Sequence, residues 1–137
     1  MSASDHPPPR PPAGRGAPAP LLVAASLAGL EAVLLVGYGV ALVPAIHGSR
    51  LAMGVTTPVF FVVYGVALAW FAWQVARLRS WARAPLVLAQ LIQLGLASSF
   101  WGGPSTVAAV IIGVVAVIVL AGIFHPASLA ALAHDDG

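Results

Sequence analysis

The stretch LLVAASLAGLEAVLLVGYGVALV, residues 21–43, decides the fold because it has the length and composition of a helix that crosses a bilayer. Such a helix needs about 20 consecutive, mostly apolar residues. Glu31 is the only residue of the stretch that is charged at neutral pH. An ionised acid at the centre of a spanning helix costs about 3 kcal/mol, whereas the twelve Leu and Val residues here return roughly 4 to 7 kcal/mol. The stretch is therefore expected to insert, with a carboxyl group deep in the membrane.

The rest of the 137-residue chain has the same character, since 60% of all residues are hydrophobic and 7% are charged. In soluble domains about a quarter of the residues are charged. Three further apolar segments follow the first, at about residues 55–75, 84–101 and 104–124, and the segment at 84–101 is the shortest and most polar. Only GGP joins the last two segments, which predicts an antiparallel hairpin. The sequence predicts an all-α polytopic membrane protein, a bundle of four transmembrane helices.

The two ends of the chain differ from this central part. Residues 1–20 hold seven of the twelve prolines, which is typical of a disordered, Pro-rich tail. Residues 125–137, HPASLAALAHDDG, are expected to form a short tail, either with one amphipathic turn at the membrane interface or frayed. The transmembrane domain is thus expected at residues 21–124.

The distribution of arginine predicts the orientation. The chain has no Lys, and with four spans five of its six Arg residues fall on the side of the N-terminus and only Arg50 on the other. Basic residues in short loops mark the cytoplasmic side, so a multi-pass protein of the cell membrane with both termini in the cytoplasm is expected. A cleaved secretory signal ending at VPA, residues 43–45, is the alternative, but the apolar run is too long for one and contains Glu31.

Five polar side chains are expected to gather within the membrane. The midpoints of the first three segments lie near residues 32, 65 and 93, so Glu31, Tyr64 and Gln93 are expected at one depth. Gln90 lies one helical turn from Gln93 toward the cytoplasm, and Tyr38, seven residues after Glu31, shares its helix face. The sequence therefore predicts an intramembrane polar cluster around Glu31.

Two interpretations of this cluster remain open. In the first, a protonated Glu31 is hydrogen-bonded to Gln93 or Tyr64 and fixes the helix register; such contacts contribute about 0.6 kcal/mol on average. In the second, Glu31 is a proton-binding site in a transport cycle, because intramembrane acids often mark ion pathways.

Small residues at four-residue steps predict where other helices pack closely. One such face lies on the first segment and a second on the last, which is expected to face lipid or an oligomer partner. A membrane-protein partner or a second copy is therefore expected to bind through these small-residue faces, which comprise Ala25, Gly29, Gly37 and Ala41, and Ala109, Gly113, Val117 and Ala121.

The loop RLRSWARAP, residues 77–85, carries Arg77, Arg79 and Arg83. These residues are expected to determine the topology. They could also bind anionic lipid headgroups, since a basic residue near an anionic membrane surface contributes about 1 kcal/mol.

The sequence lacks the residues that several classes of functional site require. There is no Cys, and the four His residues are scattered over tails and an outer loop without ligand spacing, so neither a metal site nor a cofactor is expected. No catalytic constellation is visible, so no enzyme is expected. The Arg residues are dispersed between apolar runs, which argues against nucleic acid as a partner.

The run RLRSWARAPLVLAQLIQLGL, residues 77–96, the proline-led last segment and PASLAAL, residues 126–132, resemble a group of small four-helix integral membrane proteins of actinobacteria. The likeness covers residues 21–132 loosely. Its most specific part is the basic-Trp-Ala-Arg-x-Pro entry to the third segment, with Gln90 following. Most members of the group are uncharacterised, so the resemblance implies a fold and a lineage but no activity.

Small multidrug-resistance transporters are similar in topology only, since they are four-helix chains with a Glu midway along the first helix. This sequence lacks the aromatic-Trp-Ser-Gly pattern of their second helix. Many of them also insert in both orientations, whereas the Arg distribution here favours one.

These observations predict a small integral membrane accessory or interaction protein that performs no catalysis and has the lipid bilayer as its surroundings. The alternative is a proton-coupled small-molecule transporter that works as an oligomer through Glu31.

Overall fold

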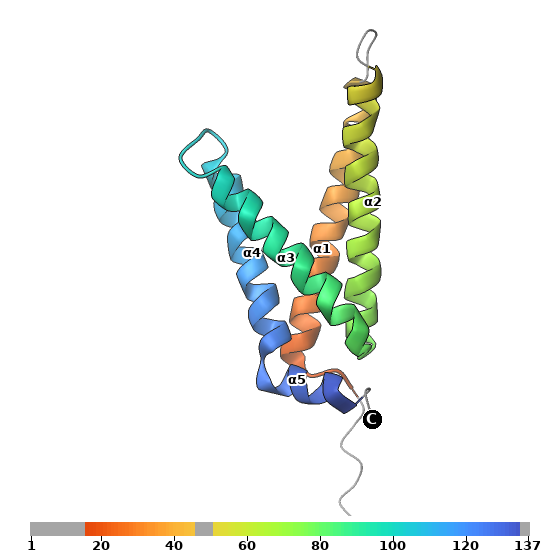
Figure 1. Ribbon diagram of the computed structural model, residues 1–137, viewed down its shortest axis with the longest axis vertical. Coiled ribbons are helices and arrows are strands. Elements are labelled where there is room, and N and C mark those ends of the chain that lie inside the picture. Colours follow the sequence, from red (N-terminus) through yellow and green to blue (C-terminus); the bar gives the residue numbers. More distant parts are fainter. Residues whose placement is uncertain (1–15, 46–50, 135–137) are drawn as a thin grey trace, which may run out of the picture.

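The computed structural model describes residues 16–45 and 51–134, and every regular element in these ranges is helical (Figure 1). The prediction of an all-α protein is thus confirmed. The five α-helices are α1 (Ala19–Ala41), α2 (Leu51–Ala76), α3 (Arg83–Ser99), α4 (Thr106–Phe124) and α5 (Pro126–Ala133). Most of the predicted tail 1–20, together with Arg10, Arg15 and Arg50, lies outside the described residues.

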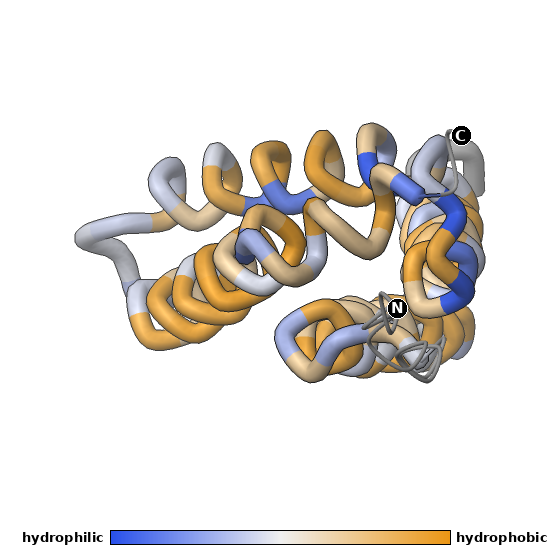
Figure 2. Tube along the Cα trace, turned by 90° about the horizontal axis from the view of Figure 1, so that it is seen from below, coloured by the Kyte–Doolittle hydropathy of each residue, from blue (hydrophilic) through white to orange (hydrophobic). Residues whose placement is uncertain are grey.

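Three of these helices are long and apolar enough to span a bilayer. They are α1, α2 from Gly54 to Ala76, and α4, with mean hydropathies of 2.1, 1.9 and 3.1. Large apolar side chains are exposed along all three, which suits contact with lipid, and the tube coloured by hydropathy is mostly hydrophobic along the helices (Figure 2). The coordinates therefore indicate a multi-pass membrane protein. The other predicted span corresponds to α3, which has 17 residues.

Helices α1 and α2 form a close antiparallel pair. The buried residues of α2 recur at about half-heptad spacing, the pattern of two helices packed along their lengths. The close approach depends on glycine: a Cβ atom at Gly65 would lie 2.9 Å from the Ala32 carbonyl oxygen, and one at Gly39 would lie 2.9 Å from the Pro58 carbonyl oxygen. The buried positions of α2 are Pro58, Gly65, Leu68, Ala72 and Val75.

Helices α3 and α4 form a second pair, which meets the first at one end. A Cβ atom at Gly122 of α4 would lie 2.6 Å from the Pro20 carbonyl oxygen and 2.8 Å from Ala24 Cβ, so α4 touches the start of α1 there. At the same end α5 turns across the helix ends (Figure 1), and the Ser128 hydroxyl donates to the Gly122 carbonyl at 2.6 Å. The segment expected to be a tail with at most one amphipathic turn therefore includes a packed helix.

The two pairs diverge from this end, so the molecule is shaped like a V (Figure 1). The close contacts of α1 with α4 described above, at Ala24 and Gly122, lie at the closed end. The structure thus arranges the helices of the predicted bundle as two splayed pairs. The helix ends differ from the predicted spans by a few residues: α1 ends at Ala41, and Val43–Ala45 form a 3₁₀ turn around Pro44.

Candidate functional site

Glu31 lies between the two helix pairs and accepts two hydrogen bonds from α3. Gln90 Nε2 donates to Glu31 Oε2 at 2.9 Å, and Gln93 Nε2 donates to the same oxygen at 3.3 Å. The two glutamines are three residues apart, so both project from one face of α3. We refer to these three residues as the Glu31 cluster.

The Glu31 cluster is well placed to connect the pairs. Helix α1 packs mainly on α2 and also on α4, so its link to α3 depends on these long side chains. Gln90 is fully buried, and Gln93 is 8% exposed. A buried polar group without a partner costs about 1 to 3 kcal/mol, which favours the geometry in which the carboxyl and the two amides meet.

The amide of Gln90 is only half satisfied. Its Oε1 atom is buried and has no hydrogen-bond partner among the described residues. A rotation of the amide by 180° would exchange the positions of Oε1 and Nε2. This rotation is possible in the same space because the oxygen and nitrogen ends of the group have nearly the same shape. In the present orientation Nε2 can donate to an ionised Glu31. In the turned orientation Oε1 would accept a hydrogen bond from the O–H of a neutral Glu31 carboxyl, so this contact can serve both protonation states.

Tyr64 of α2 lies next to this cluster. Its hydroxyl donates to the Ala89 carbonyl of α3 at 3.3 Å, and its side chain is close enough to Gln93 and Glu31 to interact with both. Its ring stacks on Phe60 at 5.8 Å between centroids. Tyr64 therefore provides a contact between α2 and α3 alongside the one between α1 and α3.

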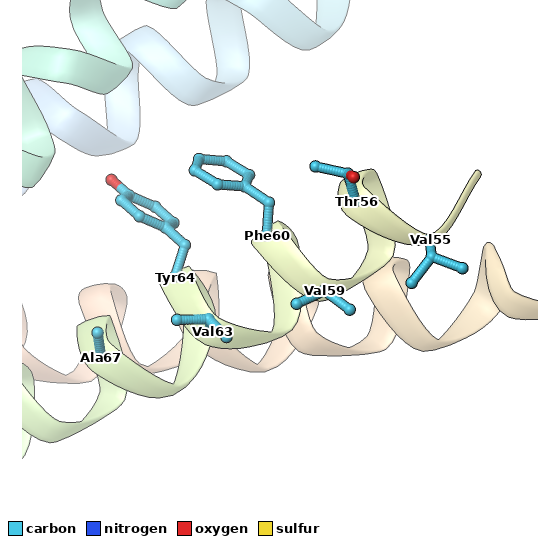
Figure 3. Close-up of a pocket in the computed structure, with 7 residues that line it drawn as sticks. All are labelled: Val55, Thr56, Val59, Phe60, Val63, Tyr64 and Ala67. Carbon is cyan, nitrogen blue, oxygen red and sulfur yellow. The ribbon is translucent and has the colours of Figure 1, made fainter. Parts of the chain in front are cut away.

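Tyr64 also ends a row of side chains on α2 that lines a hollow. In Figure 3, Thr56, Phe60 and Tyr64 project from α2 toward the second helix pair. The hollow is open and mostly apolar, with a volume of about 560 Å³. We call it the α2 groove; its lining residues are Val55, Thr56, Val59, Phe60, Val63, Tyr64 and Ala67.

Tyr38 does not join the Glu31 cluster. No hydrogen bond connects it to Glu31 within the described part of the chain; instead its ring meets Phe61 edge to face at 5.1 Å, and it is 55% exposed. Two helical turns separate Tyr38 from Glu31, a rise of about 10 Å, and over that rise α3 has diverged from α1 (Figure 1). Of the five residues expected to gather, the structure brings together Glu31, Tyr64, Gln90 and Gln93.

Only part of each predicted small-residue face packs against another helix. On α1, Ala25 is buried, whereas a Cβ atom at Gly29 or Gly37 would meet nothing within 4 Å, so this face is covered at Ala25 and open at the two glycines. On α4, Ala109 is buried and Gly113 lies near Ala97 of α3, while the rest of the ridge, Val117 and Ala121, is exposed. One end of the α4 ridge thus packs on α3, and the other end is open to lipid or to a partner.

The sequence pattern did not lead us to the glycines at which the helices come into contact. A four-residue step of alanines, Ala24, Ala28 and Ala32, marks the buried face of α1. This alanine face lies one residue away from the predicted face that begins at Ala25, and no polar residue distinguishes the two faces. Following the alanine step would have led to Gly39, seven residues after Ala32 on the same face.

The basic loop lies at the closed end of the V, between α2 and α3. Arg77, Arg79 and Arg83 are all exposed. In residues 16–45 and 51–134, no three His, Cys, Asp or Glu side chains come together as a metal site would require.

A scan against protein-family models, a search of curated proteins and a search of solved structures each found no match. The resemblance to small actinobacterial membrane proteins therefore depends on the sequence runs alone.

Proposed function

We propose that this chain is a membrane interaction protein that performs no catalysis, with α3 as its fourth span and both termini in the cytoplasm. The open V supports the proposal: the α2 groove is lined by α2 alone, and the second helix pair diverges from the first instead of covering it. Another transmembrane helix could bury groove side chains such as Phe60 and Tyr64 there. Van der Waals packing of this kind drives helix association in lipid.

Photocrosslinking tests the proposal. Phe60, in the groove, is replaced by p-benzoylphenylalanine, and Phe100, a similarly exposed phenylalanine at the end of α3, gives the matched control. We expect a discrete protein adduct from position 60 and none from position 100. An adduct of twice the chain mass in liposomes of purified protein would identify a second copy as the partner. Lipid adducts alone at both positions would contradict the proposal.

Proton-coupled transport is the second candidate, and it is favoured by the buried Gln90 Oε1, which has no hydrogen-bond partner among the residues that the structure describes. Because a turned amide can accept a hydrogen bond from the protonated Glu31 carboxyl, Glu31 can bind and release its proton without losing the α1–α3 contact. The Tyr64 hydroxyl, at the α2 groove, donates to the carbonyl of Ala89, the residue before Gln90, so a groove open to water would lead toward the Glu31 cluster.

Infrared spectroscopy distinguishes the two candidates. The band of a protonated carboxyl is recorded in lipid bilayers from about pH 4 to about pH 10, with Glu31→Gln to assign it. Transport requires the Glu31 band to disappear as the pH rises. A band that persists over the whole range would show a carboxyl sealed from water, which excludes the transport candidate and leaves the interaction role.

A further inference from the structure

The turn between α2 and α3 has a fixed backbone. Leu78 has a φ of 62°, in the left-handed region where glycine is usual at the end of a helix. Leu78 N–H donates to the Val75 carbonyl at 2.9 Å, and Arg79 N–H donates to the Gln74 carbonyl at 3.0 Å. These two bonds form a Schellman motif, which closes α2.

Leucine in place of glycine at this position has a structural consequence. The left-handed conformation costs a residue other than glycine about 1 to 2 kcal/mol, and here the Leu78 side chain packs against the buried core. Its two neighbours, Arg77 and Arg79, are exposed. The turn therefore points the Leu78 side chain toward the core and leaves the guanidinium groups of its two neighbours exposed. Arg83 follows at the start of α3.

Aromatic side chains lie in and beside this turn. The Arg77 guanidinium lies over the Trp73 ring, 4.4 Å from its centroid, and Trp81 meets Phe71 edge to face at 6.1 Å. Both Trp73 and Trp81 remain about half exposed. Tryptophan at the end of a spanning helix prefers the headgroup level of a bilayer, so this turn is expected at the depth of the lipid phosphates.

The three positive charges have no acidic partner in the part of the chain that the structure describes. Glu31 is the only acid in residues 16–45 and 51–134, and it is bound to Gln90 and Gln93. A guanidinium pairs with phosphate oxygens through two parallel hydrogen bonds, and Arg is better suited than Lys to such planar recognition.

We propose that the α2–α3 turn is a binding site for the headgroup phosphate of an anionic phospholipid, held by Arg77, Arg79 and Arg83. The site is independent of the proposed function, because it requires only that the turn lies at the membrane interface.

Fluorescence quenching by brominated lipids tests this site, because bromine quenches a tryptophan that it touches. The full chain carries Trp101→Phe, so that the remaining tryptophans, Trp70, Trp73 and Trp81, all lie near the turn. It is reconstituted with brominated phosphatidylglycerol or brominated phosphatidylcholine in both leaflets, which makes the result independent of orientation. We expect stronger quenching by phosphatidylglycerol, with a preference that falls about fivefold for each Arg removed.

Three variants show whether the turn itself is responsible. Arg79→Gln alone is expected to lower the preference for phosphatidylglycerol, and changing all three arginines, Arg77, Arg79 and Arg83, to Gln is expected to lower it further. Changing all three to Lys is expected to keep part of the preference. The matched control, Arg10→Gln with Arg15→Gln, removes two charges from the tail and is expected to keep the preference. Equal quenching by the two lipids, or an equal loss in the tail variant and the turn variants, would overturn the proposal.

Discussion

Replacing Gln90 by leucine removes the shorter of the two hydrogen bonds to Glu31, so this variant measures how strongly the Glu31 cluster holds the helix pairs together. Hydrogen bonds between helices in membranes contribute about 0.6 kcal/mol on average and at most about 1.7 kcal/mol. The Gln90 side chain is fully buried and its bond is 2.9 Å long. We therefore expect a coupling in the upper half of that range, about 1 to 1.5 kcal/mol.

The single variant is expected to show less than this coupling. Leucine also removes the buried Gln90 Oε1, whose missing partner costs about 1 kcal/mol or more in the wild-type protein. The two effects oppose each other, so Gln90→Leu alone is expected to lower the free energy of unfolding by no more than about 0.5 kcal/mol. A double-mutant cycle with Glu31→Leu isolates the pair.

The cycle is measured by unfolding in bicelles on titration with sodium dodecyl sulfate, followed by tryptophan fluorescence. Ser98→Leu is the matched control, since Ser98 is an exposed polar residue of α3 whose hydroxyl bonds only within its own helix, to the Gly95 carbonyl. Its coupling to Glu31 is expected to be about zero. If Glu31 and Gln90 couple by no more than about 0.3 kcal/mol, as independent sites do, the contact does not hold the pairs together.

Three further predictions use the same unfolding assay or hydrogen exchange. Glu31→Gln keeps an acceptor oxygen for Gln90 and Gln93 and removes a carboxyl that is partly withdrawn from water, so we expect stability equal to or above that of the wild type; a loss of more than about 1 kcal/mol would show that a negative charge is required there. Gly65→Ala places a Cβ 2.8 Å from Val36 Cγ2 and 2.9 Å from the Ala32 carbonyl oxygen, and it is expected to cost about 1 to 3 kcal/mol. Gly29→Ala, whose Cβ meets nothing within 4 Å, is expected to change stability by less than about 0.5 kcal/mol, and equal effects of the two would argue against the α1–α2 packing. Ser128→Ala removes the 2.6 Å bond to Gly122 and is expected to speed amide exchange in α5 with little effect on α1; unchanged exchange in α5 would show that this bond does not hold the helix.

Hydropathy alone was enough to predict the helical class and the approximate helix positions. Runs of about 20 apolar residues have few alternatives to a spanning helix. The same signal is weak for α3, because Gln90 and Gln93 lower its hydropathy and Ser98 and Ser99 end it early. The polarity that makes α3 a doubtful span is also what connects it to Glu31.

The partners of Glu31 could be inferred from depth, but the pairing of helices could not. Matching segment midpoints placed Gln93 near Glu31, and the helical period added Gln90. The helical period also placed Tyr38 with them, but α3 has diverged from α1 at the level of Tyr38 (Figure 1). The divergence of the two pairs depends on which small residues touch, and the alternation of Ala and Gly on α1 allows two neighbouring faces.

The central claim is that the two helix pairs are joined at Glu31 and diverge beyond it. Measuring the distance between the pairs tests this claim most directly. The chain has no Cys, so spin labels can be attached to pairs of introduced cysteines and their distances measured by electron paramagnetic resonance in lipid bilayers. One pair, Val40→Cys with Leu96→Cys, labels α1 and α3 toward the open end; the other, Leu22→Cys with Leu88→Cys, labels them toward the closed end. We predict a clearly longer distance for the first pair, and a broader distribution for it when Gln90 and Gln93 are both leucine. Equal distances for the two pairs would show a closed, parallel bundle and contradict the account.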